Sequence, residues 1–488
     1  MRDLVMALGD WAAASGSLVG RLAGSLRGVI ESGVLPPGYR FPSERTLARE
    51  LAVSRSTVVA AFAELRSAGL VETRHGSGTK VARRPRVGGD DGLPSLGAPI
   101  FGRLLARTGR DDALISFAYA ATPGNPAIAE EVLSFSHQEL VDLLDDPGYL
   151  PRGLPALREA LAALVTADGL GCDAESVLVT SGAHQAVTLC ASLLVRPGDL
   201  VLVENPTYPG CVDAFASAGA RLVSLPTDAE GMVVDGLEGV LSHSSVAAMF
   251  VMPTFQNPTG SLMAGYRRRR IAEVAGRFGV PVIEDNALSH THIGPVEVPP
   301  PIASYPGAEG APVITLGSLS KALWGGLRVG WLRAPQPWLE RLARRKVAMD
   351  MGSGVLDQAV AARVLARFPD PRLANAPLFR DRLAHTEALL RERLPGWTWR
   401  RPTGGPSLWV RLPYEAGPFC QVALRHGVEL VPGDVFGVGG SFSDHVRIPF
   451  TVEPAVMDEA VARLVDADRA HRSGARGEAR VLPPRLVV

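Results

Sequence analysis

The sequence predicts at least two domains: a small helical head with a short β-ribbon, and a large α/β body built on a mostly parallel sheet. Three observations carry this prediction. The chain has 488 residues, too many for one ordinary domain, and its hydrophobic content of 46% is enough for large cores. Two short helices are expected around a tight turn within the first 82 residues. From about residue 115 onward, β-branched runs alternate with helical stretches.

The elements of the head follow one another closely. An amphipathic stretch covers residues 22–30, and a turn rich in glycine and proline follows it. Ser43 is expected to cap the helix that begins just after it. Residues 53–59 predict a short turn and the start of a second helix, and residues 69–81 predict a two-stranded wing with a glycine-rich tip. Together these elements form a winged helix-turn-helix.

The second helix of such a motif places its N-terminal side chains in the major groove of DNA. Four polar residues occupy that position in this sequence: Ser54, Arg55, Ser56 and Thr57. Their side chains can donate to phosphates and base edges, and Arg55 is the best single candidate for a guanine contact.

The head as a whole resembles the winged helix-turn-helix of GntR-type transcription regulators, with nearly every signature position filled. The resemblance implies that double-stranded DNA contacts Arg45, Arg55, His75 and Gly76. Charge agrees with this, because residues 1–86 contain 13 Arg or Lys and 7 Asp or Glu, whereas the whole chain contains 50 of each sign. The alternative is that these arginines form the solvated face of a small helical domain.

Five buried strands are expected in the body, each followed by a polar or glycine-containing turn. They cover residues 177–180, 200–203, 247–251, 280–283 and 313–316. Such strands, separated by helices, form a parallel sheet with helices on both faces. Ligands of these sheets gather at the carboxyl ends of the strands, so the residues that follow each strand form the candidate site.

The most informative turn follows the fifth strand and contains Lys321 between Ser318 and Arg328. An amine in this position can form a Schiff base with a phosphorylated aldehyde, while the hydroxyl and the guanidinium hold the phosphate. Partial desolvation lowers the pKa of a lysine toward reactivity. The stretch closely resembles the pyridoxal-phosphate lysine motif of class I and II aminotransferases, which have fold type I.

The other strand ends match that family in the family's order. Gly182 and Ala183 open a helix whose unpaired amides suit a phosphate. The resemblance implies that Tyr208 stacks on the pyridine ring, that Asn257 bonds the phenolic oxygen, and that Asp285 pairs with the pyridinium nitrogen. The cofactor implied is pyridoxal 5'-phosphate.

Two residues farther from these turns match the same family. Arg447 occupies the position of the arginine that binds the carboxylate of a substrate or effector, for which a guanidinium fork is suited. Tyr149 matches a tyrosine that reaches the phosphate of the partner subunit, and a packed loop aromatic is its alternative role.

Several other features predict no further site. The run Arg267–Arg270 is expected to form a solvated helix face. His290 and His292 lack further ligands, so no metal site is expected, and the four widely spaced cysteines are expected to be reduced. Because about eighteen apolar residues never run unbroken, the chain is expected to be soluble and cytoplasmic, with no membrane contact.

The composition divides the chain into four parts. The head covers residues 1–82, and a linker rich in Arg, Gly, Asp and Pro covers residues 83–112. The aminotransferase-like body covers residues 113–469, and residues 470–488 are expected to be a weakly ordered tail.

A winged head in front of such a body is similar to the MocR subfamily of GntR regulators. The resemblance implies a head-to-tail, domain-swapped homodimer whose body senses pyridoxal phosphate or an amino compound that reacts with it. The family's tyrosine two residues after the ring-nitrogen aspartate is replaced here by Ala287, which places efficient proton transfer at Lys321 in doubt. Gly210 stands where an aminobutyrate-responsive member would carry an arginine, which argues against that ligand.

Two functions therefore remain open. The first is a transcription regulator that binds pyridoxal phosphate through Lys321. The second is an active aminotransferase that carries a DNA-binding head, and residual transaminase activity is compatible with either function.

Overall fold

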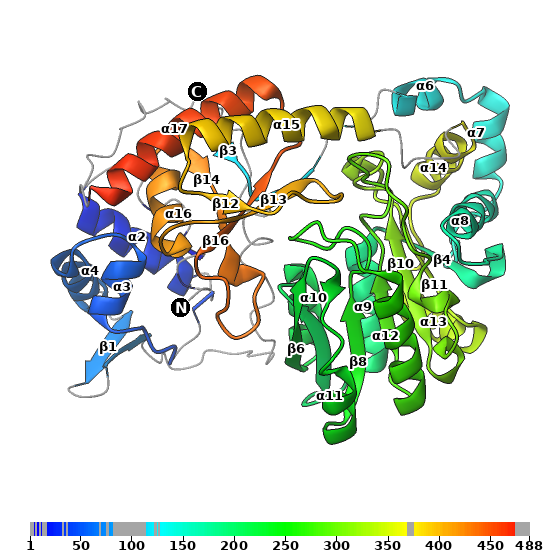
Figure 1. Ribbon diagram of the computed structural model, residues 1–488, viewed down its shortest axis with the longest axis horizontal. Helices are drawn as coiled ribbons and strands as arrows, with labels where there is room; N and C mark the ends of the chain where they lie inside the picture. The colour runs from blue at the N-terminus through cyan, green and yellow to red at the C-terminus, as the bar shows by residue number, and fades with distance from the viewer. Residues whose placement is uncertain are drawn as a thin grey trace.

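The computed structural model contains a head, a large domain with an eight-stranded sheet, and a small domain with a four-stranded sheet (Figure 1). It describes residues 4, 7–8, 11, 17–31, 34–35, 38–67, 70–74, 78–81, 114–121, 124, 127–367 and 375–473. His75 and Gly76 of the predicted wing tip and the predicted linker at 83–112 lie outside the described residues.

The head has the helices and the wing that the sequence predicts. Its elements are α2 (Leu18–Glu31), α3 (Glu44–Glu50), α4 (Arg55–Ser67), β1 (Val71–Arg74) and β2 (Gly78–Val81), with the two strands antiparallel. Ser43 caps α3 as expected, because its side chain accepts a hydrogen bond from the backbone N of Thr46 at 3.1 Å. The apolar faces of the helices bury one core around Leu22, Leu47 and Phe62.

The large domain confirms the predicted mostly parallel sheet. Its strand order is β4-β11-β10-β9-β8-β5-β6-β7, and the five central strands from β10 to β6 are parallel to one another. The strands are β4 (Val177–Thr180), β5 (Leu200–Asn205), β6 (Arg221–Asp228), β7 (Gly231–Met232), β8 (Val246–Val251), β9 (Val282–Asp285), β10 (Val313–Ser318) and β11 (Gly330–Arg333). Strand β11 is antiparallel to both of its neighbours.

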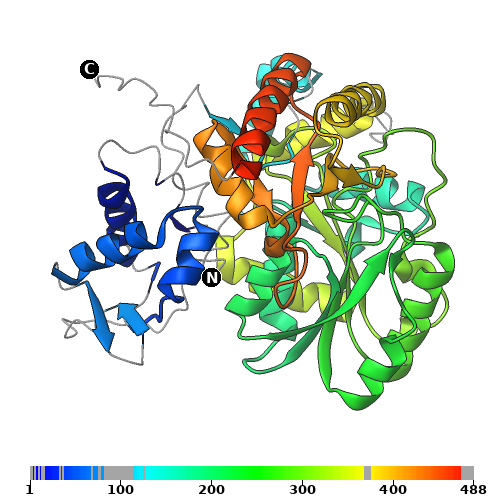
Figure 2. The same cartoon turned by 60° about the vertical axis from the view of Figure 1, so that its left-hand side comes forward.

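Helices cover both faces of this sheet (Figures 1 and 2). One face packs against α9 (Ala183–Leu194), α10 (Pro209–Ser217) and α13 (Gln336–Asp350). The other packs against α8 (Pro155–Ala167), α11 (Leu237–His243), α12 (Gly265–Phe278) and α14 (Val355–Arg367), and α6 (Ala127–Leu133) and α7 (His137–Leu144) lie at its edge. Successive residues of a strand point to opposite faces, so Ile283 and Asp285 share the face that α9 covers.

The small domain holds the antiparallel sheet β12-β13-β16-β15 and three long helices. Its strands are β12 (Thr398–Trp399), β13 (Ser407–Arg411), β15 (Val431–Pro432) and β16 (His445–Pro449). Its helices are α15 (Ala376–Arg393), α16 (Ala416–Arg425) and α17 (Pro454–Arg472). A short parallel pair, β3 (Ile115–Ser116) with β14 (Val428–Glu429), joins the start of the body to this domain.

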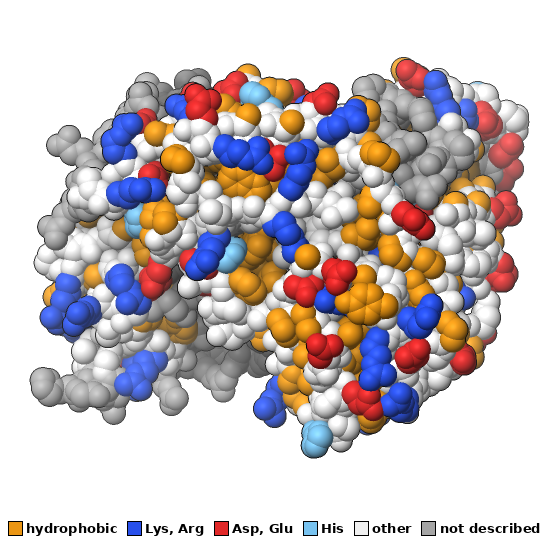
Figure 3. Space-filling view, in the orientation of Figure 1, with side chains coloured by type: hydrophobic (Ala, Val, Ile, Leu, Met, Phe, Trp, Pro, Cys, Tyr) orange, Lys and Arg blue, Asp and Glu red, His pale blue; other side chains and the backbone are white. Residues whose placement is uncertain are grey.

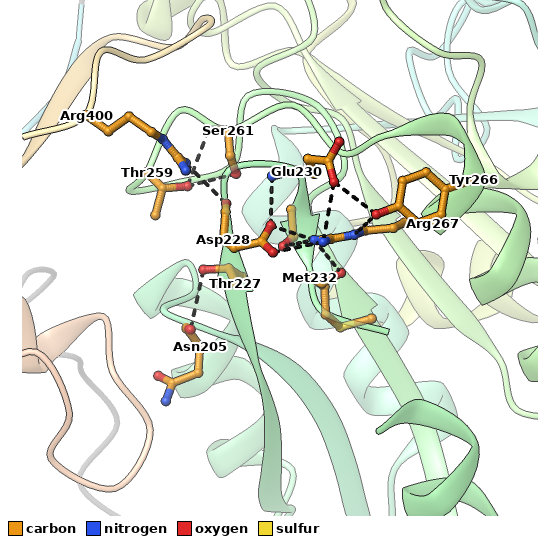
Figure 4. Close-up of polar contacts among 11 residues, drawn as sticks. Asn205, Thr227, Asp228, Glu230, Met232, Thr259, Ser261, Tyr266, Arg267 and Arg400 are labelled. Atoms are coloured by element: carbon orange, nitrogen blue, oxygen red, sulfur yellow. Dashed lines mark hydrogen bonds and ion pairs between the residues drawn. The ribbon is translucent and has the colours of Figure 1, made fainter. Parts of the chain in front are cut away.

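The expectation that Arg267–Arg270 form a solvated helix face is wrong for its first two residues. Arg267 and Arg268 are buried, whereas Arg269 is exposed. Arg267 bonds both carboxylate oxygens of Asp228, at 2.6 and 2.8 Å (Figure 4). Arg268 donates to the backbone oxygens of Pro253 and Pro299, each at 2.8 Å. These partners lie far away in the sequence, so the composition of the run gave no sign of them.

The fourth predicted strand is displaced by two residues. Gly279 ends α12 in the left-handed conformation at φ 67°, and the backbone N of Val280 still bonds the oxygen of Ala275. The strand therefore begins at Val282 and includes Asp285 as its last residue.

Candidate functional site

Lys321 lies in the turn between β10 and β11, at the carboxyl edge of the parallel sheet. Its side chain is half-buried, and burial lowers the pKa of its ammonium to about 8. The positive charges of Arg447 and Arg328 act in the same direction. Lys321 is thus an amine with a substantial neutral fraction near pH 8, which is the state that attacks a carbonyl.

Asp285 ends β9, the strand beside β10, and is almost fully buried. Burial raises the pKa of its carboxyl group to about 6, although the backbone N–H of Ala287, which donates to Oδ1 at 2.9 Å, opposes that rise. The carboxylate still ionises at neutral pH. A cationic partner would relieve the cost of its burial, which is the role that a pyridinium nitrogen fills.

Tyr208 precedes α10, and its ring lies close to Asp285 and Arg447. The negative charge of Asp285 adds to burial in raising the pKa of the Tyr208 hydroxyl, while the charge of Arg447 opposes both. The imidazole of His184 makes an edge contact with this ring, with 6.5 Å between centroids. His184 was not among the predicted site residues, although it directly follows Ala183 in the sequence.

The N-terminus of α9 lies beside Arg328. Gly182 precedes the helix with φ 135°, a conformation that favours glycine. A Cβ atom at Gly182 would lie 3.4 Å from Nη2 of Arg328, so the N-terminal end of the helix and this guanidinium share one small space. Ser318 is buried at the end of β10, where its hydroxyl bonds Ser320 Oγ at 3.0 Å. Together these groups provide the donors that a phosphate needs.

Asn257 lies on the turn after β8, half-buried, and its neighbours fix that turn against the turn after β5. Gln256 Nε2 donates to the backbone oxygen of Pro206 at 2.7 Å, and Thr259 donates to Gln256 Oε1 through both its backbone N and its hydroxyl. The segment that carries Asn257 is therefore rigidly attached to the segment that carries Tyr208.

Arg447 lies in the middle of β16 in the small domain, and its positive charge acts on both Lys321 and Tyr208. Its Nη2 donates to the backbone oxygen of Ala118 at 2.7 Å, and its guanidinium lies over the ring of Phe436 at 5.1 Å. Burial lowers the pKa of this arginine to about 10, and its Nε is buried without a hydrogen-bond partner among the described residues. A buried guanidinium with a spare donor is suited to an incoming carboxylate.

The head presents a second candidate site. Arg40, Arg45 and Arg55 line a hollow of about 450 Å³ between α3, the start of α4 and the wing. Arg55 is exposed, and its Nη2 pairs with Glu44 Oε2 at 3.0 Å. The sequence interpretation did not include Arg40, because it precedes both helices and only the pairing of its backbone with Lys80 brings it to this face.

The predicted polar residues at the start of α4 have different surroundings. Ser56 is exposed, as a DNA contact requires. Thr57 is buried, and its hydroxyl lies 2.7 Å from the hydroxyl of Ser54, which also accepts a hydrogen bond from the backbone N of Thr57 at 3.0 Å. The side chain of Thr57 thus points into the interior of the head. Ser54 caps α4 and lies near the surface of the head.

Comparison with known proteins assigns both parts of the chain. The family "Aminotransferase class I and II" matches residues 144–464, and the family "Bacterial regulatory proteins, gntR family" matches residues 18–81. The chain belongs to the class I and II aminotransferase family and carries a gntR head. This is the MocR-type architecture that the sequence predicts, and that prediction is confirmed.

Relatives of this MocR-type chain include both regulators and aminotransferases. The uncharacterized HTH-type transcriptional regulator YdfD of Bacillus subtilis (strain 168) is 32% identical over 86% of this chain and 90% of its own length. The 2-aminoadipate transaminase of Thermus thermophilus is 32% identical over 61% of this chain and 76% of its own. The structure of LysN, an α-aminoadipate aminotransferase from the same organism complexed with N-(5'-phosphopyridoxyl)-L-leucine, has a TM-score of 0.68 at 27% identity and covers 78% of this chain and 96% of its own.

Three positions of this MocR-type body bear on its chemistry. Ala287 has no hydroxyl, and Leu288, the next residue, packs into the core, so neither replaces the family's tyrosine. A Cβ atom at Gly210 would lie 2.4 Å from Cζ of Tyr208, so the observed place of this ring excludes a larger residue there. Tyr149 is 67% exposed and lies outside the cluster around Lys321.

In the part of the chain that the structure describes, no three His, Cys, Asp or Glu side chains are grouped to hold a metal ion. Within the same residues, every helix is too short or too polar to cross a membrane.

Proposed function

We propose that this protein is a DNA-binding transcription regulator whose body binds pyridoxal 5'-phosphate at Lys321 and senses that cofactor, an amino compound, or both. The observation that carries the proposal is the convergence of Lys321, Asp285 and Arg447 at one edge of the sheet, in a chain that also has a winged head. An amine, a buried carboxylate and a guanidinium with a spare donor are the groups that this cofactor and an amino acid require.

The residues fit the cofactor. The groups that would hold its phosphate, ring and phenolic oxygen come from the ends of several strands: Gly182, Ala183, Ser318, Arg328, Tyr208, Asn257 and Asp285. The space between Gly182 and Arg328, which a side chain at Gly182 would fill, supports the phosphate assignment.

The body would use these residues as follows. When bound, the cofactor supplies an aldehyde that reacts with primary amines and a ring that delocalises negative charge. Lys321 Nζ, neutral in part near pH 8, would be the amine that holds it. Asp285, ionised at neutral pH, would keep a proton on the ring nitrogen. Arg447 would bind the carboxylate of an amino compound close to Lys321.

We also propose that the chain acts as a head-to-tail, domain-swapped homodimer. Exposed apolar side chains gather near the end of α13 and the start of α14: Val347, Met349, Met351 and Leu356. Tyr149 is close to them, because Leu150 O lies 3.1 Å from the position of a Cβ atom on Gly352. A concentration of exposed apolar residues marks an interface, where Tyr149 would reach the partner subunit's phosphate group.

An active aminotransferase with a DNA-binding head is the second candidate. The set of Lys321, Asp285 and Arg447 favours it, because that set suits transamination as well as sensing. The absence of a hydroxyl at Ala287 and Leu288 favours the regulator, because proton transfer at Lys321 lacks the group that would tune it.

Operator affinity separates the two candidates when it is measured with and without pyridoxal phosphate for the wild type and for Lys321→Ala. A regulator changes affinity on binding the cofactor, and Lys321→Ala keeps DNA binding but loses that change, because a ligand acts only through its different affinity for two states. Identical responses in both proteins would reject the sensor. Multiple turnovers with amino and keto acids would instead favour the enzyme.

A further inference from the structure

A groove of about 360 Å³ lies between the small domain and the edge of the large sheet. One wall consists of the turns after β5 and β8 and the end of β6, and the other of β12, β13 and β16. Lys321, Asp285 and Arg447 do not line it, so it is distinct from the proposed cofactor site. In the space-filling view, basic and histidine side chains gather beside hydrophobic ones over β12 and β13, where these strands face the large sheet (Figure 3).

The small-domain wall of this groove is flat and aromatic. In the antiparallel register Trp409 lies opposite Arg447, and Arg411 lies opposite His445, so these residues share one face of the sheet. The ring of Trp409 stacks on His445 with 5.0 Å between centroids and 22° between planes. Phe442 contacts Trp409 edge-on at 5.8 Å. Phe436 also contacts the Trp409 ring, at 5.3 Å. His445 covers one face of the indole, so the groove offers a planar ligand the combined aromatic surface of Trp409, Phe442 and His445.

The groove is lined by two arginines, Arg400 and Arg411, and by one carboxylate, Asp228. Asp444 is engaged by two groups, because Arg411 Nε lies 2.7 Å from its Oδ2 and His445 Nδ1 lies 2.6 Å from its Oδ1. Asp228 is engaged by Arg267 from outside the groove. Arg400 reaches across from the small domain, and its Nη2 donates to the backbone oxygen of Asp228 at 3.1 Å (Figure 4). Among the described residues, no ion pair joins Arg400 to a carboxylate.

We propose that this groove is a second ligand site that binds a small aromatic anion, an aryl carboxylate or aryl phosphate. Arg400 and the terminal nitrogens of Arg411 bind the anionic group, and the ring packs on Trp409. The volume agrees with this class, since small-molecule pockets begin at about 300 Å³. The ligand touches both domains and so favours the arrangement in which they are close together.

This site has a direct route to the cofactor site. Thr259 lines the groove and lies on the same short turn as Asn257, and Pro206 lines it two residues before Tyr208. A ligand that packs against both turns restrains the segments that would hold the cofactor ring. The binding itself does not require Lys321, so it can be tested whether or not the proposed function holds.

The experiment is calorimetric titration of the full-length protein with phenyl phosphate, after saturation with pyridoxal phosphate so that the phosphate-binding residues near Arg328 are occupied. The comparison is Arg400→Gln against Arg401→Gln. Arg401 is the matched control, because it is also exposed, follows directly in the sequence, and pairs with Glu387 Oε2 at 3.0 Å outside the groove.

We expect saturable binding that Arg400→Gln weakens about ten-fold or more and that Arg401→Gln changes by less than about two-fold. Benzoate binds and its neutral counterpart benzamide does not, while inorganic phosphate binds at least about ten-fold more weakly than phenyl phosphate because it lacks the ring. No saturable binding to the wild type would overturn the proposal, as would equal weakening by both variants, which indicates diffuse charge alone. Equal affinities for phenyl phosphate and inorganic phosphate would reject the aromatic part.

Discussion

The two candidate sites of this chain hold their charges in opposite ways. In the body, Asp285 and Arg447 are buried and Lys321 is half-buried, and burial is the largest cause of the pKa shift of each. In the head, Arg55 is largely exposed, and its carboxylate partner, Glu44, lies on the neighbouring helix of the same motif.

This difference has a physical consequence for what each site can recognise. Buried charges interact strongly with a ligand and discriminate its groups, because water does not screen them. Exposed arginines attract any polyanion over a longer range, and that attraction weakens as salt increases. The buried charges of the body therefore suit a specific small molecule, and the exposed arginines of the head suit a partner that is held by the sum of several weaker contacts.

Replacing Lys321 is the change with the largest expected effect on this comparison. Lys321→Ala is expected to abolish the adduct that borohydride traps with pyridoxal phosphate, because the attacking amine is gone. The chain has three lysines, and the other two are Lys80 in the wing and the buried Lys346, which pairs with Asp350 at 2.7 Å. Mass spectrometry of the reduced protein locates the adduct, and Lys80→Arg is the control. An adduct that persists in Lys321→Ala would show that another amine is used.

Asp285→Asn is expected to have opposite effects with and without the cofactor. The pKa of Asp285 in the folded protein is raised to about 6, because its charged form is buried. The stability of the wild type without cofactor should therefore fall as pH rises from about 4 to about 6. Without cofactor, the variant should be more stable to unfolding than the wild type above pH 6, by up to about 2 kcal/mol, and the difference should shrink below pH 4. With cofactor, its affinity should fall about ten-fold or more, because the ring nitrogen loses its anion.

Thermal unfolding across pH and cofactor titration measure the two effects separately. A variant that is less stable than the wild type without cofactor at pH 7 would contradict the assignment of burial as the main cause of the shift.

Two substitutions in the head are expected to weaken DNA binding in different ways. Arg55→Ala is expected to cost about 1–3 kcal/mol on the specific operator and to relax base preference, because Arg55 stands at the start of α4, the helix proposed to enter the major groove. Arg45→Ala is expected to weaken binding to all sequences and to lower its salt dependence, as the loss of a phosphate contact does. Affinities for operator and unrelated DNA over a range of salt concentrations distinguish the two. Unchanged operator affinity in both variants would reject this face as the DNA interface.

The sequence predicted well the features that are local in the chain. The strand that ends in Ser318 and the turn that carries Lys321 follow from a short β-branched run next to glycine and serine. The Ser43 cap follows equally from residues within one helical turn.

Features that depend on distant partners escaped prediction. Strand β11 inserts antiparallel between β4 and β10, a pairing set by the packing of three separate segments. Arg268 is buried because carbonyl oxygens from two other loops satisfy its guanidinium. The place of His184 against Tyr208 depends on the contact between two helices, so its proximity to the site could not be read from spacing.

Arg447→Ala should change the pH dependence of cofactor attachment. Its positive charge helps to lower the pKa of Lys321, so its removal moves that pKa up from about 8, toward the ordinary value of 10.5. Attachment needs the neutral amine, and therefore its rate should rise with pH through a midpoint that lies higher in the variant. Absorbance-monitored attachment between pH 6 and 10 measures this. A midpoint that stays the same or falls would show that the charge of Arg447 does not lower the pKa of Lys321.

The smallest expected effect concerns the pair of Arg55 and Glu44 in the head. Without DNA, Glu44 Oε2 accepts from both Nε and Nη2 of Arg55, at 3.2 and 3.0 Å, so binding to a base must break or share this pair. Exposed ion pairs contribute about 0–1 kcal/mol, so Glu44→Gln should tighten operator binding by no more than about five-fold. Glu64→Gln removes the same charge from the exposed face of α4 and serves as the control. If both variants tighten binding equally, net charge alone explains the gain, and if Glu44→Gln weakens binding, the carboxylate orients Arg55 for the base instead of competing with it.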